Sequence, residues 1–319
     1  MSFIKILCVG LMVCDLLIKP VTRETLSADS AKAEAIRMLV GGDAFNVASN
    51  LSALGTETTL YSAVGEDAFG AFALDYAEKL GVSTQWIKTT DGPTSVTAVL
   101  IHPDGERSFV VQRGASHELK ERQISDDLLR KYDLLYIGSA CGIPGLDGEG
   151  LTKLLHRAKV LDCKTAMDIT GNPTRRSAAQ LLPALPNLDF FLPSAYEAMD
   201  LSGRDSPGKA ADYFHEKGVP VVAVKMGGQG ALLSAGGKQE VFPAYEGPVV
   251  DTTGAGDSFI GSFLYQLTRD GVTAETLADI PQEKLADYLA FSSECSAYTV
   301  QHKGAVMPTE EDLRMENGE

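Results

Sequence analysis

The chain has 319 residues, of which 44% are hydrophobic and 22% are charged, the proportions of a globular protein with a sizeable core. Its formal net charge of −15 argues against duplex nucleic acid or an anionic membrane as a partner, because both attract clusters of Lys and Arg. The five cysteines are scattered without a C-x-x-C pair, which favours reduced thiols and a cytoplasmic protein.

The chain begins with a short apolar run, MSFIKILCVG, that is typical of a buried strand. It is too short for a signal peptide, and no run approaches the roughly 20 residues of a membrane helix. Similar runs alternate with stretches of helical period, which predicts an α/β fold with a doubly wound, mostly parallel sheet flanked by helices. We predict strands at residues 3–9, 58–64, 134–137, 165–169, 188–192 and 219–224.

Two of the predicted helices have recognisable ends. DAFNVASNLSALG repeats apolar residues at helical spacing, and Gly55 is placed to end that helix. Ser206 and Pro207 mark an N-cap and a first helical residue, and Gly218 follows the last turn. The acidic C-terminal stretch EEDLRMENGE predicts a frayed tail.

Two segments, residues 13–38 and 92–116, do not fit this alternation. The second holds two β-rich runs around HPDGER, in which Asp104-Gly105 is a hairpin turn signal. We predict that the two segments form a small β-sheet lid on a core of residues 1–12, 39–91 and 117–319. The alternative is an elaborated edge of the main sheet.

The stretch VVDTTGAGDSFIGSF, residues 249–263, joins a strand to a helix through glycines. It exposes the N–H groups of Gly254, Ala255, Gly256 and Asp257 at a helix N-terminus, which predicts an anion site. A carboxylate would repel a bound phosphate, so Asp257 fits a general base that takes the proton of an attacking hydroxyl. The alternative is a simple N-terminal helix carboxylate. No Walker A loop is present, and Phe259 stands where a G-x-G-x-x-G motif needs its third glycine.

DTTGAGDSF resembles the C-terminal signature of the ribokinase-like carbohydrate kinases, the phosphofructokinase-B type. GGDAFNVASNLSALG at 41–55 resembles the first signature of that family, and VGEDAFG follows at 64–70. The order and spacing match over essentially the whole chain. The resemblance implies a doubly wound core with a lid, ATP-dependent phosphorylation of a sugar hydroxyl, Asp257 as the base and residues 254–256 as the anion hole.

The resemblance also implies a sugar site near the N-terminus. Asp15 matches the acid that binds sugar hydroxyls, and Gly41, Gly42 and Asn46 match the sugar-binding turn and its amide. These residues supply the short donors and acceptors that a polyol site needs. The alternative for Asn46 is a helix-capping amide, and Asp43 is left between a helix cap and a sugar contact.

ATP and Mg²⁺ are the cofactors that the resemblance implies. FFLPSAYEAMD at 190–200 resembles the N-x-x-E motif that arranges Mg²⁺ and phosphate through water, with Ser194 in place of Asn and Glu197 retained. VAVKMGGQGALL at 222–233 resembles the strand and turn that face the triphosphate, with Lys225, Gly227 and Gly230 at its key positions. The alternative for Lys225 is a surface charge.

A monovalent-cation site such as K⁺ is a further implication, since some family members hold one at the positions of Asp251, Thr253, Thr299 and Gly304. The segment after Gly304 is short and lacks the matching Ser. The resemblance therefore leaves this site open.

The acceptor is not named by the sequence. A sugar phosphate would need an Arg clamp, but Arg107 is expected to be solvated at the hairpin tip, which leaves Arg113 alone. We expect an unphosphorylated sugar or sugar acid that Arg113 contacts, with Ser139 as a further candidate sugar contact. The alternatives are a nucleoside kinase of the same family and a non-catalytic sugar or nucleotide sensor.

The lid is expected to form a homodimer. Its β runs have apolar residues to bury and are poorly stable alone, and relatives often pair such lids. The residues expected to be buried are Val96, Val99, Phe109 and Val111.

Overall fold

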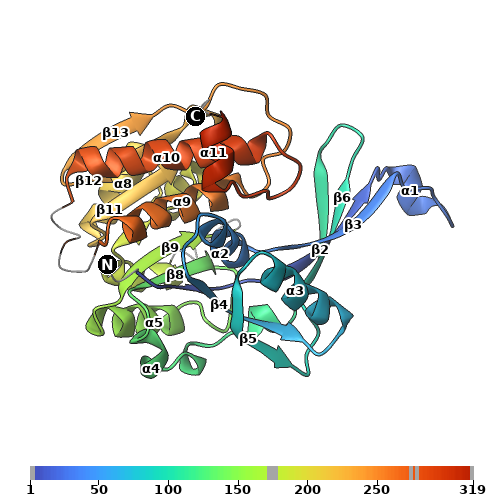
Figure 1. The fold of residues 1–319 in the computed structure, drawn as a ribbon, viewed down its shortest axis with the longest axis horizontal. Coiled ribbons are helices and arrows are strands. Elements are labelled where there is room, and N and C mark those ends of the chain that lie inside the picture. Colours follow the sequence, from blue (N-terminus) through green and yellow to red (C-terminus); the bar gives the residue numbers. More distant parts are fainter. Residues whose placement is uncertain (1–3, 171–178, 273–275, 277–279, 317–319) are drawn as a thin grey trace.

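The computed structural model describes residues 4–170, 179–272, 276 and 280–316. Figure 1 shows an α/β core and a smaller set of strands that projects from it on the right. None of the helices in the described residues has the length and apolar character needed to span a bilayer.

Within the described residues, nine strands form the main sheet in the order β13-β12-β11-β10-β9-β8-β1-β4-β5. The pairs β11/β12 and β12/β13 are antiparallel and the other neighbouring pairs are parallel, which confirms the predicted fold class. The strands are β1 (Ile6–Val9), β4 (Thr58–Gly65), β5 (Ser83–Thr90), β8 (Leu134–Ala140), β9 (Lys164–Ile169), β10 (Phe190–Phe191), β11 (Val221–Lys225), β12 (Ala231–Ala235) and β13 (Lys238–Phe242).

Helices cover both faces of the main sheet, and this burial explains why its inner strands are continuous apolar runs. One face packs on α2 (Asp43–Ala53), α3 (Ala68–Lys79), α9 (Ala255–Arg269), α10 (Gln282–Val300) and α11 (Glu310–Glu316). The other face packs on α4 (Asp126–Leu129), α5 (Glu149–Val160), α7 (Ala195–Ser202) and α8 (Pro207–Glu216).

The helix-end predictions can be compared with these bounds. The Ser206 side chain caps α8 by accepting the N–H of Lys209, as predicted. The prediction of a frayed C-terminal tail is wrong, because α11 forms there and packs on the core through buried Leu313.

A second sheet, hereafter the lid, has the order β3-β2-β6-β7 and is separate from the main sheet. Its strands are β2 (Val13–Lys19), β3 (Ala35–Gly41), β6 (Val96–Ile101) and β7 (Arg107–Gln112), and the short α1 (Arg23–Ser27) lies at its outer end (Figure 1). The strand register fixes the two faces of the lid, because side chains alternate along each strand. One face carries Asp15, Leu17, Leu39, Thr97, Val99, Arg107, Phe109 and Val111. The other carries Leu16, Ile18, Ile36, Met38, Ala98, Leu100 and Val110.

Candidate active site

The N-terminus of α9 presents unpaired backbone N–H groups. Gly254 precedes the helix with a φ of 76°, a left-handed conformation that favours glycine. No side chain caps this helix, and among the described residues the N–H groups of Gly256 and Asp257 have no hydrogen-bond partner. Together with the positive end of the helix dipole, they form a site able to bind an anion.

Asp257 lies in the first turn of α9 and contacts α2. The side-chain amide of Asn46 donates from Nδ2 to Asp257 Oδ2 over 2.7 Å, so Asn46 is not a helix cap. Burial and then the charge of Asp43 raise the pKa of Asp257 well above its usual range, against the opposing effects of Asn46 and Lys225. A carboxylate with a raised pKa is suited to accept a proton near neutral pH.

Asp43 is the first residue of α2 and is held by Ser139 at the end of β8. Ser139 Oγ donates to Asp43 Oδ2 over 2.8 Å. The Ser139 backbone has a φ of 64°, a strained conformation of the kind found at functional sites. The capping interpretation of Asp43 is wrong, because the N-cap position is Gly42 and α2 has no side-chain cap.

Asp15 approaches the start of α2 from the lid strand β2. Its Oδ2 lies so close to Gly41 that a Cβ added there would be 2.5 Å away, so a side chain at position 41 would displace it. Burial raises the pKa of Asp15 to about 6. The structure thus brings Asp15, Gly41, Gly42 and Asn46 to one end of α2, and their role as sugar ligands stays a prediction.

Lys225, at the end of β11, lies beside the N-terminus of α9. A Cβ added to Gly256 would be 3.8 Å from its Nζ. The same Nζ donates to Asp168 Oδ2 over 2.8 Å, and the two side chains are only 14% and 7% exposed. Lys225 is therefore not a free surface charge.

Asp168, near the end of β9, is a site residue that the sequence analysis missed. Burial raises its pKa to about 7, the charge of Lys225 lowers it, and the charge of Glu197 raises it. Its position near the carboxyl end of a predicted parallel strand could have indicated a site residue, because α/β proteins bind ligands at that end of the sheet.

Ser194 and Glu197 bind each other at the start of α7. Ser194 N donates to Glu197 Oε2 over 2.8 Å, and Glu197 N donates to Ser194 Oγ over 3.3 Å, a reciprocal capping box. The Ser that replaces the expected Asn therefore caps a helix. Gly227 and Gly230 lie in the turn between β11 and β12, directly after Lys225.

Asp251, Thr253 and Gly304 lie close together at the turn that precedes α9. Asp251 Oδ1 accepts from the N and Oγ1 of Thr253, and Asp251 Oδ2 accepts from Gly304 N over 3.0 Å. Thr299 Oγ1 donates instead to backbone carbonyls of residues 295 and 306. Arg107 was expected to be solvated at the hairpin tip. The residue is exposed there, but its side chain, 32% exposed, also crosses from the lid to Asp251 and Thr253, which the sequence did not predict.

Arg113 follows β7 and is exposed, and no hydrogen bond or ion pair of its side chain is found among the described residues. It lies close enough to His117 that, together with the larger effect of burial, its charge lowers the pKa of His117. Its role as an acceptor ligand stays a prediction.

These groups lie at the carboxyl ends of parallel strands and at the starts of α2 and α9. A buried carboxylate next to an N–H anion site and a lysine, with a lid that carries a second carboxylate, is an arrangement typical of a phosphotransferase that acts on a hydroxyl.

Comparison with known proteins agrees with this class. Residues 4–312 match the family described as pfkB family carbohydrate kinase, and the chain belongs to that family. An uncharacterized sugar kinase from Archaeoglobus fulgidus is 32% identical over 216 residues, which cover 67% of this chain and 84% of that protein. The chain is thus a carbohydrate kinase.

Solved structures share the fold. A fructokinase from Xylella fastidiosa with bound ATP superimposes with a TM-score of 0.86 at 23% identity, covering 99% of both chains. A double mutant of fructokinase from Vibrio cholerae, bound to fructose, ADP and a potassium ion, superimposes with a TM-score of 0.79 at 21% identity, again covering 99% of both chains. At these identities the likeness shows the fold alone.

Proposed function

We propose that this kinase transfers the terminal phosphoryl group of ATP to a hydroxyl of an unphosphorylated sugar or sugar acid, with Asp257 as the general base. The contact between Asn46 and Asp257 carries the proposal, because it joins the expected sugar-binding turn to the anion site. A hydroxyl bound at the start of α2 would have the base and the N–H groups on one side of it.

The chemistry follows from the groups at the start of α9. Asp257 accepts the proton of the attacking hydroxyl, and its raised pKa favours this transfer. The unpaired N–H groups of Gly256 and Asp257 hold the charge of the moving phosphoryl group, whereas the N–H of Ala255, which was expected to join them, donates to Thr252 O over 3.3 Å. Lys225 adds a positive charge on the side where the triphosphate would lie.

The nucleotide side fits Mg²⁺ through its carboxylates. Mg²⁺ prefers oxygen ligands and keeps several waters. Glu197 uses only Oε2 in the capping box. Its charge raises the pKa of Asp168, so the two carboxylates lie near each other. Glu197 would hold the ion through water, and the ion would neutralise phosphate charge when bound. Gly227, Gly230 and Ser194 would line the nucleotide.

The acceptor side of the site favours a sugar whose reacting end carries no charge. Asp15, Asp43 and Asp257 gather around the start of α2, and a phosphate placed there would meet uncompensated negative charge. Any carboxylate of the acceptor would lie at the far end, toward Arg113. The fructokinase from Vibrio cholerae, which has fructose bound, supports an unphosphorylated sugar as the acceptor.

We also propose a homodimer through the lid. Its second face is a row of apolar side chains, of which Ile36 and Val110 are 64% and 61% exposed. Val99, Phe109 and Val111, which were expected to be buried in a dimer, instead share a face with Asp15 and would cover the sugar. The dimer surface is thus the opposite face.

The experiment is a panel of neutral sugars, sugar acids, sugar phosphates and nucleosides, assayed for acceptor-dependent ADP release and for the phosphorylated product. The proposal expects the highest kcat/KM with a neutral sugar or a sugar acid. A best acceptor that is a phosphorylated hexose would make Arg113 a phosphate ligand and overturn the acceptor assignment. A nucleoside as best acceptor would support the nucleoside-kinase alternative, and binding without turnover would support a sensor.

A further inference from the structure

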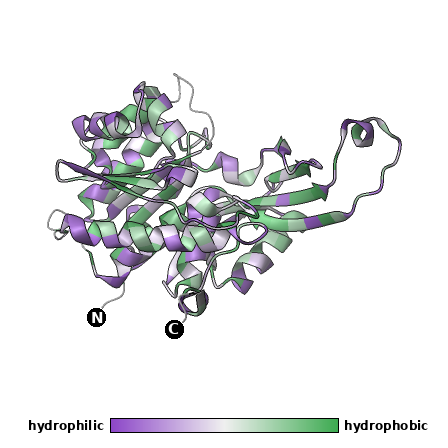
Figure 2. Cartoon of the chain, turned by 90° about the horizontal axis from the view of Figure 1, so that it is seen from above, coloured by the Kyte–Doolittle hydropathy of each residue, from purple (hydrophilic) through white to green (hydrophobic). Residues whose placement is uncertain are grey.

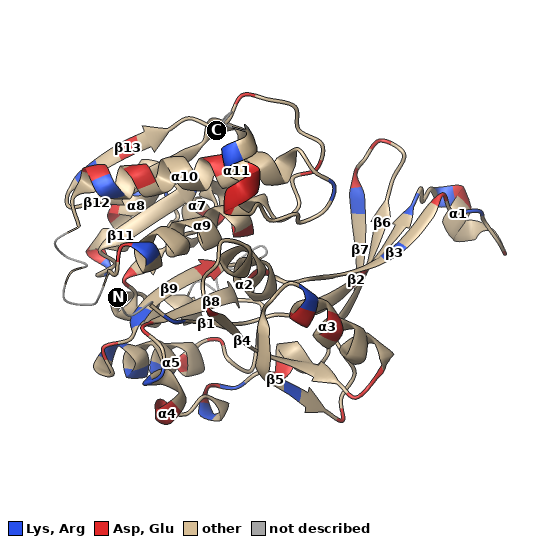
Figure 3. Cartoon of the chain, viewed as in Figure 1, with Lys and Arg blue, Asp and Glu red and all other residues tan. Residues whose placement is uncertain are grey.

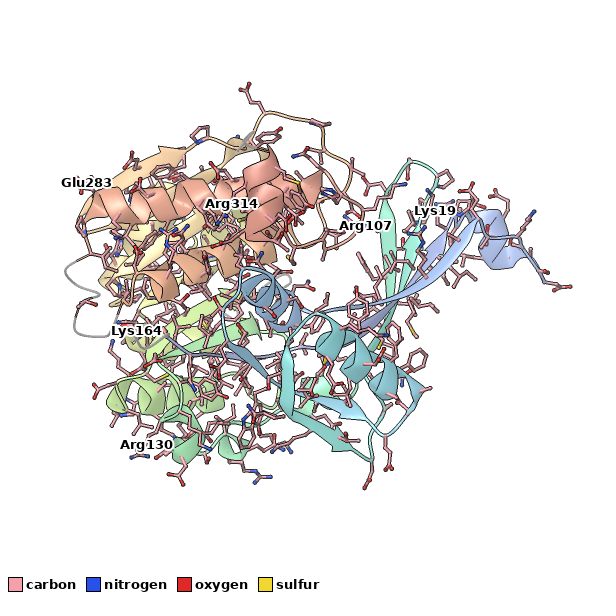
Figure 4. The ribbon with its side chains drawn as sticks, viewed as in Figure 1. Lys19, Arg107, Arg130, Lys164, Glu283 and Arg314 are labelled. Carbon is pink, nitrogen blue, oxygen red and sulfur yellow. The ribbon has the colours of Figure 1, made fainter. Side chains whose placement is uncertain are left out.

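One ion pair connects the lid to the core at the anion site. Arg107 Nη1 lies 3.5 Å from Asp251 Oδ1 and also donates to Thr253 Oγ1, although these residues are about 145 positions from Arg107 in sequence. Figure 4 labels Arg107 between the lid hairpin and the loops of the C-terminal half, and Figure 3 colours the tip end of β7 blue. Both side chains of the pair are about two-thirds or more buried, at 32% and 26% exposure.

The hairpin presents Arg107 in a defined position. Arg107 pairs with Ile101 across the hairpin and lies on the same lid face as Asp15. His102 braces the tip, with Nδ1 against Val21 O at 2.9 Å and Nε2 against Ser108 Oγ at 2.8 Å. The guanidinium therefore reaches the core from an ordered strand end.

Both oxygens of the Asp251 carboxylate accept hydrogen bonds, and Oδ1 accepts most of them. Its Oδ1 accepts from Thr253 and Arg107, and its Oδ2 accepts from the N–H of Gly304. A monovalent cation needs lone pairs from oxygen ligands, so at Oδ1 it would compete with the guanidinium and with both donors of Thr253. The Thr299 hydroxyl also points at two backbone carbonyls and not at Asp251. The residues present fit an arginine better than a free cation.

We propose that Arg107 is a positioning residue that supplies the positive charge beside the anion site, in place of a monovalent cation, each time the lid closes. Thr253 directly precedes Gly254, whose conformation exposes the N–H groups of α9. Arg107 thus orients this turn through Thr253 and Asp251 and touches no substrate itself. The N–H groups would be oriented for phosphoryl transfer only under a closed lid, which limits hydrolysis of ATP without acceptor. The inference rests on the proposed kinase activity.

The test compares wild type, Arg107→Ala, and the control Arg23→Ala, which removes an exposed lid arginine on α1. Each is assayed with K⁺ and with K⁺ replaced by tetramethylammonium, and with added guanidinium. Wild type and the control should keep kcat within about twofold in all salts. Arg107→Ala should lose at least tenfold in kcat without K⁺, about the effect of one charge-assisted hydrogen bond, and K⁺ or guanidinium should restore part of it.

Two further readouts separate the inference from the kinase proposal. Addition of K⁺ should raise the Tm of Arg107→Ala but not that of wild type, and this can be measured without any acceptor. Hydrolysis of ATP without acceptor should rise relative to transfer in Arg107→Ala. A wild type that requires K⁺, or an Arg107→Ala variant that neither K⁺ nor guanidinium changes, would overturn the inference. Failure of every acceptor in the panel would instead overturn the proposed function, with the Tm comparison still deciding the role of Arg107.

Discussion

Asn46 and Asp257, 211 residues apart in sequence, are joined by a 2.7 Å hydrogen bond between the first turns of α2 and α9. One turn further along both helices, a Cβ added to Gly261 would lie 2.4 Å from Asn50 Oδ1, so the two helices run side by side in close contact. The turn before α2, which we propose binds the sugar, and the anion site before α9 consequently lie side by side. Under the proposed function, this contact would keep a bound hydroxyl at a fixed distance from Asp257.

The charge of Asp43 is expected to set the pH range in which Asp257 can act as the proposed general base. Its charge contributes to the raised pKa of Asp257, so kcat/KM should fall on the acid side as Asp257 takes up a proton. Asp43→Asn removes that charge and lowers the pKa of Asp257, so the acid limb of the pH profile should move to lower pH. Ser139→Ala is the matched control, because it removes the bond to Asp43 but keeps the charge. A limb that stays in place or moves up in Asp43→Asn would contradict this coupling.

Asp15→Ala should raise the KM for the sugar far more than the KM for ATP, because Asp15 reaches the site from the lid. In wild type the sugar KM should also rise below about pH 6, since the raised pKa of Asp15 means that its carboxylate is protonated there and accepts hydrogen bonds less well. The variant should lack that component. Steady-state kinetics with the sugar and with ATP varied in turn measure the two KM values. Equal effects on both would indicate structural damage.

Arg113→Ala should weaken acceptor binding by about 1.5–3 kcal/mol, the range for a hydrogen bond to a charged group. Calorimetric titration of the best acceptor in the presence of a non-hydrolysable ATP analogue measures this change. Arg23→Ala, which removes an exposed arginine of α1 outside the two faces of the lid sheet, serves as the control. Unchanged acceptor affinity in Arg113→Ala would remove Arg113 from the site.

The lid dimer is tested by light scattering at micromolar concentration. We expect a dimer for wild type and a monomer for the double variant Ile36→Glu/Val110→Glu, because buried carboxylates would oppose association of the apolar face. Leu26→Glu, at an exposed apolar residue of α1 outside that face, should remain dimeric. A monomeric wild type would remove the dimer and leave the chemistry intact. Much of the length of the lid strands is green in Figure 2, the colour of hydrophobic residues.

The sequence predicted the inner strands β1, β4, β8, β9, β10 and β11, because burial on both faces demands uninterrupted apolar runs. β4, for example, is buried at every position. The inner strand β12 and the edge strands β5 and β13 escaped prediction. β13 is almost entirely exposed and its sequence is typical of a polar loop. The tail was misread because Leu313, which packs α11 on the core, is surrounded by charges in sequence.

Site residues were predictable where a local motif records the chemistry. The turn before α9 is such a case, because its glycines and its aspartate are adjacent in sequence. Asp168 and Arg107 belong to no motif, and each acquires its partner only when distant segments fold together. A hairpin arginine looks solvated in sequence until the lid places it over the core.

Asp257→Asn tests the central claim most directly, because it removes the base while an amide oxygen can still accept the hydrogen bond from Asn46. The measurement is kcat with the best acceptor, set against the affinity for MgATP determined by titration and the circular dichroism spectrum of the variant. We predict an unchanged spectrum, near-normal MgATP binding and a kcat at least ~10³-fold lower, the scale lost with a general base or a key electrostatic group. A variant that loses MgATP affinity but keeps its turnover rate would contradict the assignment of Asp257.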